Sequence, residues 1–204
     1  MSTRRRGILL VVSAPSGGGK TTLVKSAMAA EPSLQLSVSC TTRKPRDGEV
    51  DGVDYRFVSQ QNFRECLDEG EFVEWAEVFD HAYATPRTPL DVAIGEGRDI
   101  LLDVDIQGAR SLRKAYPKDA VGIFVMPPSA AVLETRLRAR GTDDEAQIAR
   151  RLARVREEVS AAREVGVYDY LIVNDDRDKA ADDLLSIIRA ERCRQGRLAP
   201  PDLE

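Results

Sequence analysis

The stretch ILLVVSAPSGGGKTT, residues 8–22, decides the fold of this chain. Its first five residues are consecutive and apolar, which is typical of a buried strand. A glycine-rich loop follows, and residues 21–30 then predict a helix that ends before Pro32. A strand, a glycine-rich turn and a helix in this order indicate the opening of a parallel α/β sheet.

The loop has the composition of a phosphate-binding loop. Its glycines let backbone N–H groups approach phosphate oxygens, Lys20 supplies a positive charge, and Thr21 supplies a hydroxyl for Mg²⁺. The strict pattern begins with glycine where this chain has Ala14, so we expect a negative φ there. The alternative is a chance glycine-rich turn, which the flanking strand and helix disfavour. The residues predicted to bind a nucleoside triphosphate are Ala14, Pro15, Ser16, Gly17, Gly18, Gly19, Lys20, Thr21 and Thr22.

Composition and charge narrow the classes of function. The 204 residues predict one domain, long enough to bury a sizeable core. A net charge of −4 argues against broad nucleic-acid binding, and the apolar run at 8–12 is too short for a signal peptide or a membrane span. Cys40, Cys66 and Cys193 are widely spaced and odd in number, which predicts reduced thiols in a cytoplasmic protein. The arginines at residues 4–6 are expected to form a solvated tail.

The parallel core is expected to resume in the second half of the chain. Buried strands are predicted at residues 99–105, 121–126 and 170–173, and a closing helix is predicted at residues 179–192. The first of these strands has carboxylates clustered at its C-terminal end. Residues 195–204 contain two prolines and predict a frayed tail.

A helical pair is predicted between the last two of these strands. Ser129 is expected to cap the first helix, Gly141 to end it, and residues 142–145 to form a capping box for the second. The second helix has one apolar face, formed by Ile148, Leu152, Val155 and Val159.

Residues 34–91 have a different pattern, which predicts an α+β insert in the parallel core. Leu34, Leu36 and Val38 alternate with polar residues, as in a strand with one buried face. A helix is expected over residues 59–69.

The insert contains a candidate for a second anion site. Arg43 and Arg46 stand three apart in a polar stretch, and arginine forks match phosphate oxygens bidentately. The hydroxyls of Tyr55 and Tyr83 are candidate further donors. The alternative for any one of these arginines is a solvated surface charge.

The residue types of the insert also suggest which base it would bind. Guanine presents N1–H and N2–H₂ donors and an O6 acceptor, so a site for it needs carboxylate acceptors and a hydroxyl donor. Glu74 lies in an apolar context where a carboxylate needs a partner, Thr85 supplies a hydroxyl, and Asp103 or Asp105 adds acceptor capacity. The alternative for Glu74 is a half-exposed strand residue.

Several motifs resemble those of guanylate kinase of the bacterial type, in order and over roughly residues 7–192. They are the loop at 13–22, Ser39 to Arg46, Asp54-Tyr55, Glu74-Trp75, residues 83–86, 103–108, 127–129 and 136–142, and Val173 to Asp176. Ala84 stands where the family often has glycine, and neither this residue nor Ala14 removes a functional side chain. The resemblance implies a P-loop nucleoside monophosphate kinase of the α/β class, with a parallel sheet flanked by helices, an α+β GMP-binding insert and a helical lid.

The resemblance also implies roles for individual residues. Those expected to hold the GMP phosphate are Ser39, Arg43, Arg46, Tyr55 and Tyr83. Those expected to hold guanine are Glu74, Thr85 and Asp105, with Asp103 acting near Mg²⁺ through water. Lid arginines at the phosphate junction are Arg136, Arg140 and Arg151. For Arg138, Arg150 and Arg154, ion pairing with nearby acidic residues is the preferred interpretation.

These features predict one enzyme with three parts. The core is expected over residues 7–33, 97–128 and 165–195, the GMP-binding region over 34–91, and the lid over 129–160. Asn174, after a core strand, is a candidate to touch the adenine or its ribose, although asparagine in a turn is commonly structural.

The expected reaction transfers the γ-phosphate of ATP to GMP, giving ADP and GDP, with Mg²⁺ as cofactor, in purine metabolism and GMP recycling. Lys20, Arg43 and the lid arginines would neutralise charge, because phosphoryl transfer depends mainly on positioning and electrostatics. The expected partners are these small molecules, with no nucleic acid or membrane, and a homo-oligomer is left open. The alternatives are a non-catalytic guanylate-kinase-like binding module and a kinase for another nucleoside monophosphate.

Overall fold

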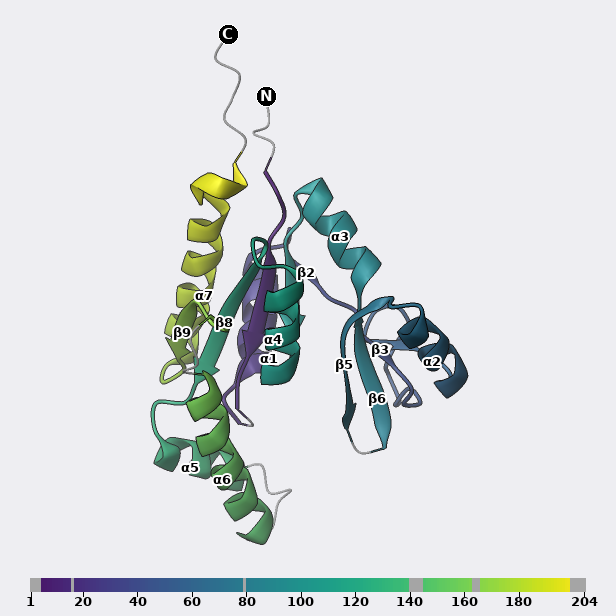
Figure 1. Cartoon of the computed structure of the whole chain (residues 1–204). Coiled ribbons are helices and arrows are strands. Elements are labelled where there is room, and N and C mark those ends of the chain that lie inside the picture. The colour runs from purple at the N-terminus through teal and green to yellow at the C-terminus, as the bar shows by residue number, and fades with distance from the viewer. Residues whose placement is uncertain (1–4, 16, 79, 140–144, 163–165, 199–204) are drawn as a thin grey trace.

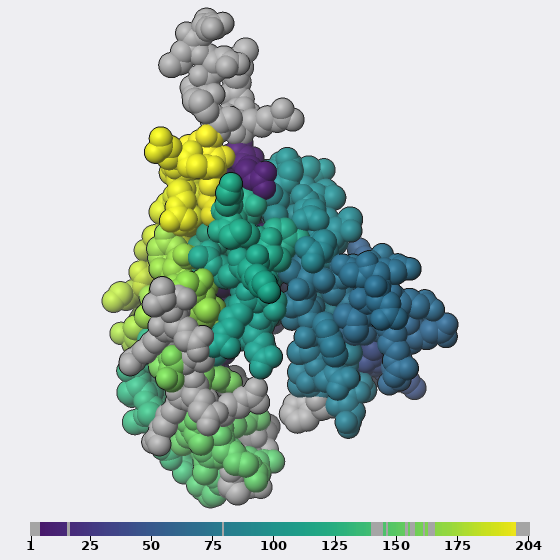
Figure 2. Space-filling view, in the orientation of Figure 1, coloured from purple at the N-terminus to yellow at the C-terminus, as the bar shows by residue number. Residues whose placement is uncertain are grey.

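The computed structural model describes residues 5–15, 17–78, 80–139, 145–162 and 166–198. Figure 1 shows a core, an insert beside it, and a helical pair at one end of the core sheet. In the space-filling view of Figure 2 the insert meets the core in its upper part, and below this contact a groove opens between the insert and the rest of the molecule. The strands of the core are β2 (Gln35–Leu36), β7 (Ile100–Asp103), β1 (Leu9–Ser13), β8 (Ala120–Met126) and β9 (Tyr170–Val173), in that order across one parallel sheet. Its helices are α1 (Lys20–Ala30), α3 (Arg87–Glu96), α4 (Ile106–Ala115), α7 (Arg177–Arg192) and the short 3-10 helix η1 (Gln195–Arg197).

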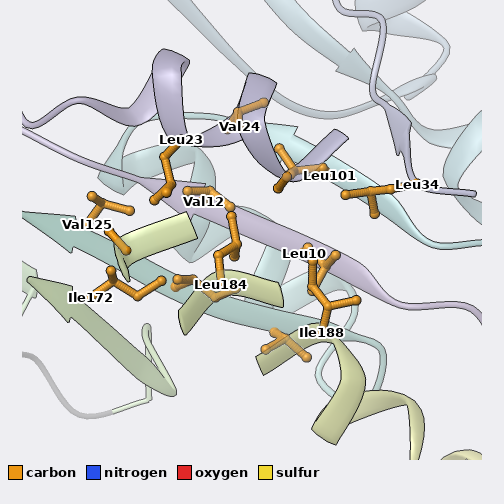
Figure 3. Packing of buried hydrophobic residues seen from close by; sticks show 14 of the residues in the cluster. Leu10, Val12, Leu23, Val24, Leu34, Leu101, Val125, Ile172, Leu184 and Ile188 are labelled. Carbon is orange, nitrogen blue, oxygen red and sulfur yellow. The ribbon is translucent and has the colours of Figure 1, made fainter. Parts of the chain in front are cut away.

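The central strand β1 is apolar throughout residues 9–12 because helices cover both faces of the sheet. Leu10 and Val12 pack on one face against α1 and α7, as Figure 3 shows. Leu9 and Val11 pack on the other face against α3 and α4. The predicted buried strand, first helix and closing helix are therefore confirmed, whereas α3 and α4 were not predicted.

The parallel register brings polar groups together at one edge of the sheet. Val12 pairs with Asp103, so the loop after β1 and the carboxylate at the end of β7 lie side by side. The predicted strands at 121–126 and 170–173 are confirmed as β8 and β9. The strand predicted over 99–105 ends at Asp103, because Asp105 is the N-cap of α4.

The expected one-sided strand at residues 34–38 is wrong in its extent and its place. Only β2 forms there, and it pairs in parallel with β7 at the edge of the core sheet. Leu34 is buried, but Leu36 is 39% exposed, since an edge strand has a neighbour on one side only. The first strand after α1 thus belongs to the core sheet and not to the insert.

The insert is a mixed sheet covered by one helix. Its strands are β4 (Arg56–Phe57), β3 (Cys40–Thr41), β6 (His81–Pro86) and β5 (Phe72–Val78), in that order, and its helix is α2 (Gln60–Asp68). The hydroxyl of Ser59 caps α2 by accepting from Asn62 N at 3.1 Å, which confirms the predicted helix. Phe63 and Phe72 fill the small core of the insert, with ring centroids 4.9 Å apart.

The helical pair consists of α5 (Ala130–Ala139) and α6 (Glu145–Ala162). Leu133 and Leu137 of α5 pack against Val155 of α6, which confirms the predicted apolar face. The hydroxyl of Ser129 accepts from Val132 N at 3.2 Å, as expected of a cap. The capping box predicted at 142–145 lies outside the described residues except for Glu145.

The two ends of the described chain are held by ion pairs, of which those at Asp99 share a buried carboxylate. Arg5 donates to both oxygens of Asp99 at 2.6 and 2.7 Å, and Arg192 donates to the same carboxylate at 2.8 Å. Arg6 pairs with Asp119 in the same way, at 2.9 and 2.8 Å. The expectation of a solvated arginine tail is therefore wrong for Arg5, whereas the side chain of Arg6 stays 59% exposed although it pairs with Asp119.

The expectation of a frayed tail is wrong for residues 195–198. Arg197 is only 4% exposed and donates to Glu191 at 3.1 Å. Leu198 forms a β-bridge with Arg5, so the start and end of the described chain are joined. The bridge between Arg5 and Leu198 joins segments that are far apart in the sequence, which is why local composition did not predict it.

Cys40, Cys66 and Cys193 are free thiols, as their spacing predicted. Among the residues that the structure describes, no helix combines the length and the apolar composition that a membrane crossing requires.

Asp99→Ala should lower the free energy of unfolding by about 3–5 kcal/mol, because it leaves Arg5 and Arg192 without their buried partner. Urea unfolding followed by circular dichroism measures this. Glu96→Ala is the matched control, since Glu96 pairs with Arg98 at the surface and its loss should cost no more than about 1 kcal/mol. Equal losses in the two variants would contradict the role given to the Asp99 cluster.

Candidate functional site

The loop after β1 has the geometry of an anion cradle. Gly17 and Gly19 have φ of 85° and 91°, a conformation that residues with a Cβ rarely adopt. The loop residues Ala14, Pro15 and 17–22 line a hollow of about 310 Å³. Helix α1 begins at this loop, and no side chain caps its N-terminus. Its first N–H groups and the positive end of its dipole are thus available to an anion.

Ala14 fits the cradle in place of the usual glycine. Asp80 is the only non-glycine residue in the described part of the chain with a positive φ, so the expected negative φ of Ala14 is confirmed. Gly18 N donates to Pro15 O at 2.8 Å and closes the turn beneath the hollow. Ser16, which was predicted to bind the triphosphate, lies outside the described residues.

Lys20 is held at the carboxyl edge of the sheet. Its Nζ forms an ion pair with Asp103 and donates to Val104 O at 2.9 Å. Asp103 keeps about a third of its side chain exposed, at 36%. Thr21 is the next residue of α1. It is exposed and lines the hollow formed by the loop. The structure thus gathers a cation, a carboxylate and a hydroxyl at one edge.

Arg43 forms the centre of the second anion site. Its two terminal nitrogens donate to the two oxygens of Glu49 at 2.9 and 2.8 Å, and one of them also donates to Lys44 O at 2.8 Å. The guanidinium lies over the rings of Tyr55 and Phe57, 5.4 and 5.7 Å from their centroids. The side chain of Tyr83 also interacts with the guanidinium, whose edge on the Nε side is not used by Glu49 or by Lys44 O.

Glu49 anchors the arginine loop from two sides. Besides Arg43, it accepts from Arg46 N at 2.7 Å. These bonds, first that of Arg43, lower the pKa of Glu49 to about 2, and the same pairing raises the pKa of Arg43. Glu49 was not among the predicted site residues. The three-residue spacing of Arg43, Arg46 and Glu49 along a polar loop was the signal that could have indicated it.

The remaining residues predicted for this site differ in their contacts and in their exposure. The rings of Tyr55 and Tyr83 meet edge to face, with centroids 6.0 Å apart. Ser39 directly precedes β3 and is partly buried. The side chain of Arg46 is exposed, and only its backbone takes part in the contacts of the loop.

Glu74 is a residue of the insert whose carboxylate lies next to helix α4 of the core. Its Oε1 accepts from the hydroxyl of Thr85 at 2.5 Å, across the β5–β6 hairpin. A Cβ on Gly108 of α4 would lie 3.1 Å from Glu74 Oε2, so this glycine leaves room for the carboxylate. Asp105 caps α4 by accepting from Gly108 N at 2.8 Å. Burial raises the pKa of Glu74, the Thr85 hydroxyl lowers it, and the charge of Asp105 raises it further.

The lid arginines are placed only in part. Arg136 on α5 donates to Asn174 O at 2.9 Å, and Arg151 lies on α6. Arg140 lies outside the described residues. Arg138 pairs with Glu134 at 2.9 Å and with Glu145, which confirms ion pairing as its role.

Asn174 lies against the loop and not in open solvent. It is 6% exposed, and its Nδ2 donates to Gly18 O at 2.8 Å. Its backbone continues the ladder between β9 and β8 by donating to Met126 O at 2.8 Å.

Comparison with known proteins gives one consistent family. The guanylate kinase family model matches residues 6–191. The chain is 52% identical to guanylate kinase from Maricaulis maris over 201 residues, which cover 98% of this chain and 90% of that protein. It is also 52% identical to guanylate kinase from Aromatoleum aromaticum, over 92% of this chain and 90% of the relative. The crystal structure of guanylate kinase from Anaplasma phagocytophilum has a TM-score of 0.74 and 34% identity, covering 97% of this chain and 93% of that one.

Glu74→Gln should make the protein more stable than the wild type at pH 8, by on the order of 1 kcal/mol. A carboxyl whose pKa is raised on folding binds more protons folded than unfolded, so stability falls as pH rises from about 4.5 through the raised pKa. Glutamine keeps an acceptor for the Thr85 hydroxyl but does not ionise, so this decrease in stability with pH should disappear. Urea unfolding at pH 4 and pH 8 measures it, with exposed Glu77→Gln on the same strand as the control. The same pH dependence in Glu74→Gln and wild type would refute it.

Proposed function

This chain belongs to the guanylate kinase family, and on that premise we propose that it transfers the γ-phosphate of ATP to GMP, giving ADP and GDP. The observation that carries the proposal is a pair of anion sites in one molecule. The cradle at Lys20 suits a triphosphate, and the fork of Arg43, with Glu74 and Thr85 on the same insert, suits a guanine nucleotide monophosphate. The reaction belongs to purine nucleotide metabolism and recycles GMP.

On the ATP side, the loop residues 14–22 would hold the phosphates through backbone N–H groups and Lys20. Mg²⁺ would be held by Thr21 and, through water, by Asp103. The donor set fits this ion, because Mg²⁺ keeps several waters and takes few protein ligands besides substrate phosphates. The described residues contain no cluster of three or more His, Cys, Asp or Glu that would form a site without the nucleotide. When bound, the ion neutralises phosphate charge and orients the γ-phosphate.

On the GMP side, the free edge of Arg43 would take two phosphate oxygens, assisted by a set of neighbouring donors from Ser39, Arg46, Tyr55 and Tyr83. Glu74 would accept from the N1–H and N2–H₂ groups of guanine, and the carboxylate of Asp105 would add an acceptor. Thr85 would support Glu74 or reach O6. Adenine lacks the N1–H donor, so it would leave the half-buried carboxylate without the hydrogen bonds that guanine would donate, which is a strong basis for rejection.

The chemistry that these residues support is in-line transfer without a covalent intermediate. The attacking oxygen of GMP is already anionic, so no general base is required. Lys20 would neutralise the ATP side, Arg43 the GMP side, and the lid arginines Arg136, Arg140 and Arg151 the junction. Closure of lid and insert across the groove in Figure 2 would exclude water and prevent hydrolysis of ATP.

We propose the division into core, GMP-binding region and lid that the sequence predicted, with one change. Strand β2 is assigned to the core, because it belongs to the core sheet. We place the GMP-binding region after residue 38, up to about 91, and the lid at about 129–160. We also propose a cytoplasmic location, which the proposed substrates and the three free thiols support.

A coupled assay of ADP formation with ATP, Mg²⁺ and a panel of monophosphates tests the proposal. GMP should be turned over much faster than AMP, CMP or UMP. Lys20→Ala should lower kcat by roughly 10²–10³-fold with an unchanged circular dichroism spectrum, because it removes one preorganised positive group. Turnover of no monophosphate would favour a non-catalytic binding module, and preference for AMP or UMP would refute the guanine assignment.

Glu49→Gln should raise KM for GMP by about tenfold, the effect of losing one charge-assisted hydrogen bond, while KM for ATP changes little. Glu49 binds the two terminal nitrogens of Arg43 and leaves the Nε side of the guanidinium for the phosphate. A neutral glutamine would hold the guanidinium less firmly. Glu65→Gln, on the exposed face of α2, is the matched control. A lower KM for GMP in Glu49→Gln would mean that Glu49 competes with the phosphate and does not position Arg43.

A further inference from the structure

The insert has a second hollow, on the opposite face of the hairpin that carries Glu74. The carboxylate of Glu74 lies next to α4 of the core, so the alternation along β5 directs Trp75 and Glu77 to the face that α2 covers. Figure 1 shows α2 on the side of the insert sheet that lies away from the core. The hollow between α2 and the hairpin has a volume of about 180 Å³. One layer of sheet therefore separates it from the proposed GMP site.

Apolar side chains form the inside of this hollow. Phe63 and Leu67 of α2 form one wall. Trp75 and Ala82 of the hairpin form the other wall, and the rings of Phe63 and Trp75 meet edge to face with centroids 6.5 Å apart. Phe63 is buried in the core of the insert, whereas Trp75 stays 48% exposed. The ring of Trp75 is thus available to the apolar part of a ligand.

Charged groups of both signs line the same hollow from opposite sides. Arg64 comes from α2, whereas Glu77 and Asp80 come from the hairpin. Within the described part of the chain, none of these three side chains forms an ion pair or a hydrogen bond, although Asp68 lies one helical turn after Arg64. A single exposed charge is commonly solvated. Here, however, a guanidinium and two carboxylates share one small apolar hollow without neutralising each other.

This charge pattern suits a small molecule that carries both an anionic and a cationic group. A guanidinium binds a carboxylate through two parallel hydrogen bonds, and carboxylates accept from an ammonium group. The face of Trp75 would also attract the ammonium. The hollow is smaller than the roughly 300–1,000 Å³ of pockets for drug-sized ligands, so it suits a ligand of the size of a single amino acid.

We propose that this hollow binds a zwitterionic amino acid with an apolar side chain. Arg64 holds the carboxylate, Glu77 and Asp80 hold the ammonium group, and the apolar side chain lies against Trp75. This site goes beyond the proposed function and does not depend on it. The amino acid and GMP would occupy opposite faces of the hairpin, so the two should not compete.

The fluorescence of Trp75 tests the proposal on the full chain, because Trp75 is the only tryptophan in the sequence. L-Phenylalanine is the probe, since it does not absorb where tryptophan is selectively excited. Its titration should give a saturable change in emission, and excess GMP should change Kd by less than about twofold. Phenylacetate lacks the ammonium group and phenethylamine lacks the carboxylate. Each should bind at least about tenfold more weakly, because each loses a charge-assisted hydrogen bond.

Variants of the charged residues identify which end of the ligand each residue holds. Arg64→Gln should weaken L-phenylalanine by about tenfold and leave phenethylamine unchanged, because this amine has no carboxylate. Glu77→Gln combined with Asp80→Asn should weaken phenethylamine and leave phenylacetate unchanged. Asparagine tolerates the φ of 65° at position 80, so the turn of the hairpin is kept. Arg56→Gln is the matched control, since Arg56 is an exposed arginine of the insert outside the hollow.

Three results would overturn the proposal. The first is the absence of a saturable change in emission up to about 10 mM L-phenylalanine, a concentration at which even a weak ligand of this size should bind. The second is equal binding of phenylacetate or phenethylamine, which would mean that the charges are not read. The third is displacement by GMP, which would place the probe in the GMP site. Absence of GMP turnover in the wild type would refute the kinase proposal and leave the fluorescence result standing.

Discussion

The structure of the site depends on a set of backbone N–H groups that must stay unpaired in the free protein and point to one side. Unpaired backbone donors are costly unless water or a ligand reaches them, so the chain exposes them at an open hollow. A strand buried on both faces fixes the loop from below, and α1 begins directly after it. Gly17 and Gly19 supply the backbone angles, and Asn174, which follows the edge strand β9, donates to Gly18 O.

A second constraint is that each cation proposed to bind phosphate has a partner in the free protein. Lys20 pairs with Asp103, Arg43 with Glu49, and Arg136 with the carbonyl of Asn174. Without these partners, several positive groups would gather around one groove in the absence of substrate. The pairs also orient the side chains, which lowers the entropy lost when phosphate arrives. For Arg43 the partner takes one edge of the fork and leaves the other, so orientation and access are both provided.

The sequence was informative where its pattern is local. The apolar run at 8–12 and the apolar face of α6 each depend on neighbours within a few residues, and both were confirmed. Contacts that join distant segments were not predictable. The partner of Arg5 is 94 residues away and that of Arg192 is 93 residues away, so both ends looked solvated or frayed. Asp105 resembled a strand residue until its capping of α4 was visible.

The placement of Glu74 shows why selectivity and stability oppose each other here. The carboxylate comes from the insert, its hydroxyl partner from the same hairpin, and Asp105 and Gly108 from the core. Burial raises the pKa of Glu74, so burial opposes the charged form that the proposed contact with guanine requires. A base that donates hydrogen bonds to the carboxylate would offset the cost of burying its charge, whereas a base without those donors would not. Because the acceptors lie on both sides of the junction, reading the base also ties the insert to the core.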